Sequence, residues 1–209
     1  MSEAMFEPRS FQEQASTREK ILDATTSLLA GSCLHSISIR DIAATAGANS
    51  ALISYYFGSK EQLYEAVLQH QFDAYNKQVV SAFKSEGDIR ENLRQACAAI
   101  VDFHRLNPCW LTLYFRELSN PSACYTKIVL PVIAEASRHA TGMIQAGIDQ
   151  GIFKPDINPR FIVQSFVGML NYCFMTCRLQ KDLNIAPATD IESYLAFTVE
   201  MIMATITRQ

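Results

Sequence analysis

The sequence predicts an all-α protein, and three observations support this fold class. Helix signals recur along the whole chain of 209 residues. No stretch shows sustained alternation of apolar and polar residues with β-branched enrichment, which is the pattern of a strand. Short segments with glycine turns come first, and the composition becomes more apolar beyond residues 85–88, so we expect two domains.

The composition is that of a globular protein. Hydrophobic residues make up 49% of the chain, which is too many for a disordered one. The net charge of −3 excludes a polybasic tail but is compatible with a local DNA-reading face. The six cysteines are scattered through apolar stretches, and the N-terminus has no apolar core of signal-peptide length, so a cytoplasmic protein is expected. Residues 161–177 carry no charge, yet they are few for a membrane span, which favours a helix buried on all sides.

Capping signals place the first and fourth helices. "STRE" is a capping box, so the first helix is predicted to begin at Ser16 and to end at Gly31. Residues 1–15 are expected to form a flexible arm. A second box, "SKEQ", predicts that the fourth helix begins at Ser59 and runs to about Lys84.

The two helices between them are short. Ser38 in "SIRD" caps the second helix, which ends at Gly47, and Asn49 caps the third, which ends at Gly58. Two short helices joined by "AGAN" have the outline of a helix-turn-helix, although a plain αα-hairpin has the same outline.

The stretches "REKILDATTSLLA" and "SIRDIAATAGANSALISYYFGSKEQLYEAVL" carry a recognisable pattern. An Ile-Ala pair, a spaced Ala-Gly pair, a helix ending in Tyr-Phe and a Ser-Lys-Glu-x-Leu helix start follow in order. In these residues the sequence resembles the DNA-binding domain of the TetR family of transcriptional regulators. The resemblance implies that residues 38–46 brace the fold and that residues 49–57 form the recognition helix in the DNA major groove. It also implies a helix-turn-helix DNA-binding domain at 16–62 and a helical effector-binding and dimerisation domain at 63–209.

Several side chains of this region are candidates for DNA contact. Ile53 and Phe57 share the inner face of the third helix, so Tyr55 should point outward and offer its hydroxyl to a phosphate. Arg40 suits a base edge and Lys60 a phosphate, although a solvated lysine or a half-buried tyrosine is the simpler alternative. The predicted DNA-contacting residues are Ser38, Arg40, Asn49, Ser50, Ala51, Leu52, Ser54, Tyr55, Tyr56 and Lys60.

The rest of the chain is predicted to form five more helices. Their expected ranges are 88–105, 108–118, 121–150, 159–180 and 189–207. Pro131 should bend the third of these. The last two helices are apolar on nearly all sides and therefore need two packing partners. The resemblance implies that a second subunit supplies one of them, through a four-helix interface of a homodimer.

Aromatic residues with a few polar neighbours suit a ligand cavity in this second domain, although an aromatic stripe at helical spacing is also typical of a packed core. The resemblance implies a pocket for an effector, which the lining suggests is a small apolar or aromatic molecule. The candidate lining residues are Phe103, His104, Trp110, Tyr114, Met169 and Tyr172. The cysteines are accompanied by no cluster of histidines or carboxylates, so neither a metal nor a cofactor is expected.

The sequence contains no nucleophile elbow, phosphate-binding loop or HExxH motif, so no catalytic residues are assigned. The interpretation is a DNA-binding transcriptional regulator, a ligand-released repressor that acts as a homodimer on a palindromic operator. The alternative is an all-helical small-molecule or lipid-binding protein, or an enzyme, without a DNA role. That alternative assigns no function to Arg40, Tyr55 or Lys60.

Overall fold

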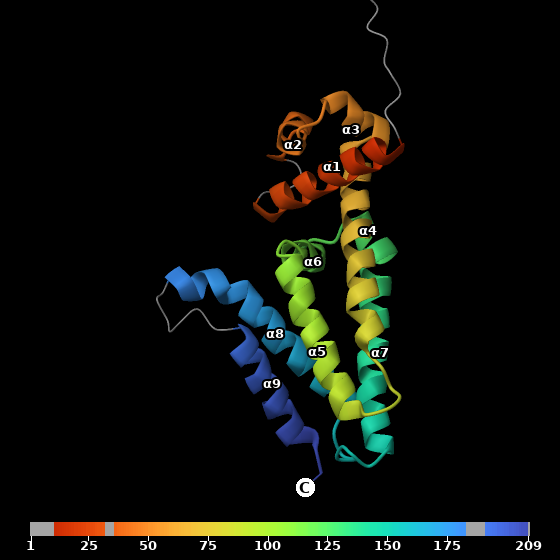
Figure 1. The fold of residues 1–209 in the computed structure, drawn as a ribbon, viewed down its shortest axis with the longest axis vertical. Helices are drawn as coiled ribbons and strands as arrows, with labels where there is room; N and C mark the ends of the chain where they lie inside the picture. Colours follow the sequence, from red (N-terminus) through yellow and green to blue (C-terminus); the bar gives the residue numbers. More distant parts are fainter. Residues whose placement is uncertain (1–10, 32–35, 183–190, 209) are drawn as a thin grey trace, which may run out of the picture. The chain divides into compact units, whose positions relative to one another are not determined.

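The computed structural model describes residues 11–31, 36–182 and 191–208. It divides into two compact units inside one helix, between Gln71 and Phe72. The helices, coloured from red to blue in Figure 1, are α1 (Phe11–Gly31), α2 (Ile39–Ala46), α3 (Ser50–Phe57), α4 (Lys60–Gln78), α5 (Ile89–Leu106), α6 (Trp110–Ser119), α7 (Leu130–Asp149), α8 (Pro159–Asp182) and α9 (Ile191–Ile206). No strand occurs within the described ranges, which confirms the all-α prediction. None of the helices in those ranges is long and apolar enough to span a membrane.

Helix α1 begins at Phe11, so the predicted start at Ser16 is wrong. Ser16 lies inside the helix because the preceding residues, Phe-Gln-Glu-Gln-Ala, include no helix breaker and several good helix formers. Residues 11–15 of the predicted arm are therefore helical, and residues 1–10 lie outside the described part of the chain.

Helix α2 begins and ends as predicted. The Ser38 hydroxyl accepts a hydrogen bond from the Asp41 backbone N–H at 3.1 Å, and the Asp41 carboxylate accepts one from the Ser38 backbone N–H at 2.9 Å. Gly47 follows the last helical residue with φ 60°, a left-handed conformation that glycine adopts without steric cost. The turn into α3 is thus set by local chemistry.

The predicted caps of α3 and α4 are also present. The Asn49 side-chain carbonyl accepts a hydrogen bond from the Ala51 N–H at 2.9 Å. Ser59 and Gln62 exchange reciprocal hydrogen bonds of 2.9 and 3.1 Å at the start of α4. Helix α4 ends at Gln78, earlier than expected, and a 3₁₀ turn follows it. The division between the units falls further along α4 than the domain boundary proposed from the sequence.

The first unit has a small apolar core. Helix α1 packs on α2, and α2 packs on α3. The fully buried apolar side chains of this core include Ile21, Leu22, Leu29, Ile42, Ile53, Leu63 and Leu68. They come from all four helices, so burial orients the helix-turn-helix as a whole.

In the second unit, α5, α6 and α8 lie close to their predicted ranges. Helix α7 packs on α5 and α8, and α9 packs on α5 and α8. The predicted start of the last helix, near residue 189, lies outside the described residues. The predicted helix 121–150 is helical from residue 123 to Asp149, passing through a π-helical turn, Tyr125–Val129, before it continues as α7. Pro131 lies directly after this π-helical turn, in the first turn of α7.

The connection between α7 and α8 is held to the end of α9. Phe153 and Thr207 form an isolated antiparallel bridge, and the Lys154 N–H donates to the Ile206 carbonyl at 2.7 Å. The Phe153 ring is fully buried and lies so close to Gly147 of α7 that a β-carbon there would overlap it. Glycine at this position allows the connection to close over the core.

Replacement of Gly147 by alanine should therefore destabilise the protein by about 1–3 kcal/mol, since the Phe153 ring must shift. Gly142→Ala is the matched control on the same helix, because its β-carbon would meet only the Ser85 hydroxyl at 3.8 Å. That variant should gain about 0.5–1 kcal/mol from helix propensity. Urea denaturation of both variants measures the difference, and equal effects would contradict the close contact at Gly147.

Candidate functional site

Helix α3 presents one face to solvent. Tyr55 is 75% exposed, whereas Ile53 and Phe57 are buried, as expected from the sequence. The Tyr56 ring is half-buried and meets the Tyr55 ring edge-on at 5.2 Å. The other exposed residues of this face are Ser50, Ala51 and Ser54. An aromatic hydroxyl and two small hydroxyl side chains thus stand on the outer face of the second helix of the helix-turn-helix.

Leu52 departs from the predicted set. Its side chain is only 9% exposed, because Leu52, Ile53 and Phe57 together form the buried side of this short helix. Leu52 is therefore not retained as a DNA contact, whereas Ala51 beside it is exposed.

The residues that flank α3 differ in exposure and in whether their side chains already form helix caps. Arg40 is exposed, and Lys60 is partly exposed at the start of α4. The Ser38 hydroxyl lowers the pKa of Asp41, the Ser38 backbone N–H adds to this, and the Lys60 ammonium contributes a smaller effect. The cap at α2 and the first turn of α4 are therefore electrostatic neighbours. Ser38 and Asn49 use their side chains as helix caps.

Arg18 contacts the end of α3, and this contact was not predicted. Its guanidinium carbon lies 5.2 Å from the centroid of the Phe57 ring, a cation–π contact between α1 and the end of α3. The two residues are distant in sequence, so no local pattern could have paired them.

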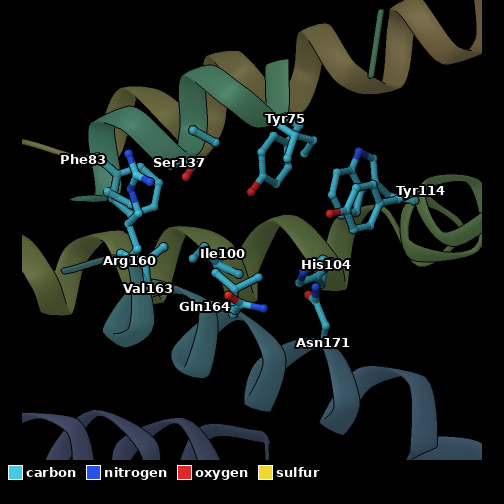
Figure 2. Close-up of a pocket in the computed structure, with 15 residues that line it drawn as sticks. Tyr75, Phe83, Ile100, His104, Tyr114, Ser137, Arg160, Val163, Gln164 and Asn171 are labelled. Atoms are coloured by element: carbon cyan, nitrogen blue, oxygen red, sulfur yellow. The ribbon is translucent and has the colours of Figure 1, made fainter. Parts of the chain in front are cut away.

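The second unit contains a cavity of about 330 Å³, shown in Figure 2. Helices α4 to α8 contribute to its wall, and its volume is within the range of small-molecule sites. Of the predicted lining residues, His104, Trp110 and Tyr114 do line it.

Phe103, Met169 and Tyr172 were wrongly predicted to line this cavity. Phe103 is fully buried behind it, against Trp110 at 5.6 Å. Residue 104 of α5 faces the cavity, so the neighbouring side chain points about 100° away. On α8 the cavity side carries residues 160, 163, 164, 167 and 171, and this leaves Met169 and Tyr172 on other faces.

Three aromatic rings form a column at one end of the cavity. Tyr75 stacks on Trp110 with centroids 4.5 Å apart and planes 9° apart, and Tyr114 stacks on Trp110 at 5.0 Å and 17°. Figure 2 shows the Tyr75 hydroxyl directed into the cavity. Burial raises the pKa of Tyr75 above its ordinary value, and the nearby Tyr114 adds to the shift. Both phenols therefore stay neutral hydrogen-bonding groups at physiological pH.

Polar groups of α8 line the opposite wall from α4 in Figure 2. Burial lowers the pKa of His104 to about 4, against a smaller opposing effect of a hydrogen bond with Asn171, so this imidazole is neutral near pH 7. Gln164 and Arg160 also line the cavity. Their spacing along an otherwise apolar helix was a signal in the sequence that could have identified them.

A helix-turn-helix with an exposed outer face, together with a helical unit that encloses a cavity, defines the class of DNA-binding transcriptional regulators. The family description "Bacterial regulatory proteins, tetR family" matches residues 21–67, and "Tetracyclin repressor-like, C-terminal domain" matches residues 86–175. The chain belongs to the TetR family of transcriptional regulators. Regulators of this family bind DNA operators, dimerise and bind ligands in their C-terminal domain. The alternatives of a lipid carrier and an enzyme are thereby set aside.

Individual relatives agree with this assignment. The HTH-type transcriptional repressor NicS of Pseudomonas putida is 27% identical over 182 residues, which cover 86% of this chain and 84% of NicS. The TetR family regulator PfmR of Thermus thermophilus has a TM-score of 0.70 at 17% identity, over 88% of this chain and 97% of PfmR. A regulator from Saccharomonospora viridis in complex with choline has a TM-score of 0.71 at 17% identity, over 93% of this chain and 100% of that regulator. At such identities the two structures show likeness of fold alone.

The buried histidine generates a prediction about pH. Its folded pKa of about 4 lies below the ordinary 6.5, so in this window the unfolded chain binds a proton that the folded protein does not. The stability of the wild type relative to His104→Gln should therefore fall by about 2 kcal/mol between about pH 7 and about pH 4.5. Denaturant titrations across this range measure it. The variant His139→Gln is the control, because His139 is exposed. If the difference in unfolding free energy between the wild type and His104→Gln does not change with pH, the His104 imidazole is not buried as a neutral group.

Proposed function

We propose that the protein is a ligand-released repressor that binds a palindromic operator as a homodimer. The observation that carries the proposal is the exposed face of α3, from which Tyr55 points outward. In the sequence, Arg40 of α2 precedes Tyr55 and Lys60 of α4 follows it. The repressor role is supported by NicS, a named repressor that matches most of both chains.

In this proposal the outer face of α3 enters the DNA major groove. Ser50, Ala51 and Ser54 meet base edges, and the hydroxyls of Tyr55 and Tyr56 bind phosphates. Arg40 can make two hydrogen bonds to a guanine. The Lys60 ammonium, in the first turn of α4, binds a phosphate. Ser38 and Asn49 contribute mainly by fixing helix ends.

The proposed dimer interface is the outer face of α8 and α9. The prediction of a helix buried on all sides does not hold for α8 in the single chain, because Phe161 and Tyr172 are 68% and 67% exposed. On α9, Phe197 is 59% exposed. Exposed large apolar side chains on two neighbouring helices are costly in water and typical of subunit interfaces. Gly168, with nothing near its β position, allows a partner helix to approach closely.

The proposed switch uses α4, which begins in the first unit and ends in the second. Tyr75 of α4 lines the cavity, so a ligand that displaces its ring moves the helix that starts at Lys60. Ligand and operator binding are then linked, provided that each favours a different position of α4. Choline, held by the Saccharomonospora viridis neighbour, is a cation, and the charged lining residue here is Arg160, so we do not propose choline as the effector.

The first test concerns the DNA contacts. Lys60→Ala and Tyr55→Phe should weaken binding to all duplexes by about 1–2 kcal/mol each, because phosphate contacts carry no sequence information. Arg40→Ala should instead relax the preference at one base pair. Anisotropy titrations with an operator selected from genomic fragments and with a scrambled duplex measure both effects. Lys84→Ala, an exposed lysine of the second unit, is the control, and a change of sequence preference in Lys60→Ala would contradict its assigned role.

The second test concerns the dimer. Phe197→Glu combined with Tyr172→Glu should convert a dimer into a monomer and abolish tight operator binding, since two charges would be buried in an apolar interface. Leu106→Glu is the matched control, because Leu106 is 73% exposed but lies on α5. Light scattering at micromolar concentration gives the masses. A wild-type monomer, or a double variant that remains dimeric, would disprove the proposed interface.

A further inference from the structure

The lining of the cavity carries a positive charge and no negative charge from the described residues. Arg160 is the charged side chain of the lining, and neither an aspartate nor a glutamate from the described residues contributes to it. His104 adds no charge near pH 7. A surface hollow that shares Arg160 with the cavity also contains Arg138, and within the described part of the chain no carboxylate side chain lines that hollow either. The cavity and this neighbouring hollow are therefore electropositive.

The Arg160 guanidinium is available to a ligand. It forms no ion pair with a carboxylate of the described residues, and its backbone N–H donates to the Asn158 side-chain oxygen at 3.0 Å. Figure 2 shows the side chain reaching from α8 toward Phe83 and Ser137, at the end of the cavity away from Tyr114. A guanidinium in this setting can bind a carboxylate through two parallel hydrogen bonds.

Acidic groups do occur nearby, but outside the lining. Asp73 and Glu135 border a separate hollow that shares Phe83 with the cavity, and Lys77 borders the same hollow. Phe83 thus borders both the cavity and this hollow, whereas Asp73 and Glu135 border the hollow alone. Their field at Arg160 is weakened by Lys77 and by solvent.

The two ends of the cavity differ in chemistry. Arg160 and Asn171 lie eleven residues apart on α8, which corresponds to about 16 Å along the helix. Between them the walls are mostly apolar, with Ile100, Val163 and Val167, and include the Gln164 amide. The far end offers the side chains of the aromatic column and the neutral polar groups of His104 and Asn171.

We propose that the effector is an elongated organic anion. Its carboxylate binds Arg160, its apolar or aromatic body follows the walls of α5 and α8, and its far end meets the aromatic column. This inference rests on the proposed ligand-released function and names the chemical class of the ligand. Arg160 is exposed, so beside a neutral molecule of the same shape it keeps its hydration but gains no ion pair, and a cation is repelled by it.

The experiment uses matched probes that differ only in charge. Calorimetry with the full chain compares ω-phenylalkanoates, from phenylpropanoate to phenyloctanoate, with the corresponding primary amides and amines. In the wild type the best acid should bind about tenfold tighter than its amide, and the amine most weakly, because hydrogen bonds between ions are stronger than those of a neutral group.

Three variants locate the source of this preference. Arg160→Gln keeps hydrogen-bond donors but removes the charge, so the acid and the amide should then bind about equally. Arg160→Lys should retain a reduced preference, and Arg138→Gln, in the neighbouring hollow, should retain all of it. Thermal melting confirms that each variant is folded.

Several outcomes would overturn the inference: equal binding of acid and amide by the wild type, tightest binding of the amine, no binding of any acid at millimolar concentration, or an acid preference that survives Arg160→Gln. DNA retention without ligand is measured in parallel. If the protein binds no DNA, the proposed function fails whatever the acid preference is. If it binds DNA but shows no acid preference, the inference alone fails.

Discussion

The stacking of Trp110 between Tyr75 and Tyr114 determines much of the second unit. The indole is 2% exposed and packs on both faces, at 4.5 and 5.0 Å, while Phe72 and Phe103 approach its ring at 5.5 and 5.6 Å. Because these rings stack on one another, they do not fill the space between α5, α7 and α8. The cavity therefore lies beside the column, and Tyr75 belongs to both.

The size of these aromatic contacts bears on the switch. A stacked pair contributes about 0.5–1.5 kcal/mol beyond the burial of its surface. Coupling between two binding sites amounts to about 1–3 kcal/mol in most allosteric proteins. Repacking of the Tyr75–Trp110 pair is therefore of the right size to shift the position of α4, and no larger rearrangement of the core is needed. A ligand with no differential contact to Tyr75 would bind without effect on DNA.

The sequence predicted best what local chemistry decides. Ser38, Asn49 and Ser59 cap their helices with atoms two or three residues away, so a single sequence contains the information. The predicted helix start at Ser16 was wrong, because a capping pattern does not set the start when good helix formers stand directly before it. Burial depends on partners far along the chain, which explains both the misplaced Leu52 and the unpredicted contact of Arg18 with Phe57. The same limit applies to α8, because an apolar helix does not reveal which face meets a cavity.

Helix α8 carries two surfaces with different partners. Arg160, Gln164 and Asn171 face the cavity, while Phe161 and Tyr172 are exposed on another side of the same helix. In the proposed dimer, an axial shift or rotation of α8 that tightens Arg160 on an anion also moves the subunit contact. Such a helix links ligand binding to the geometry of the dimer as well as to α4. The two routes act on the same quantity, the spacing of the recognition helices, which a palindromic operator fixes at about one DNA turn, roughly 34 Å. In this proposal a small movement of either helix releases the DNA, because the groove tolerates little change in that spacing.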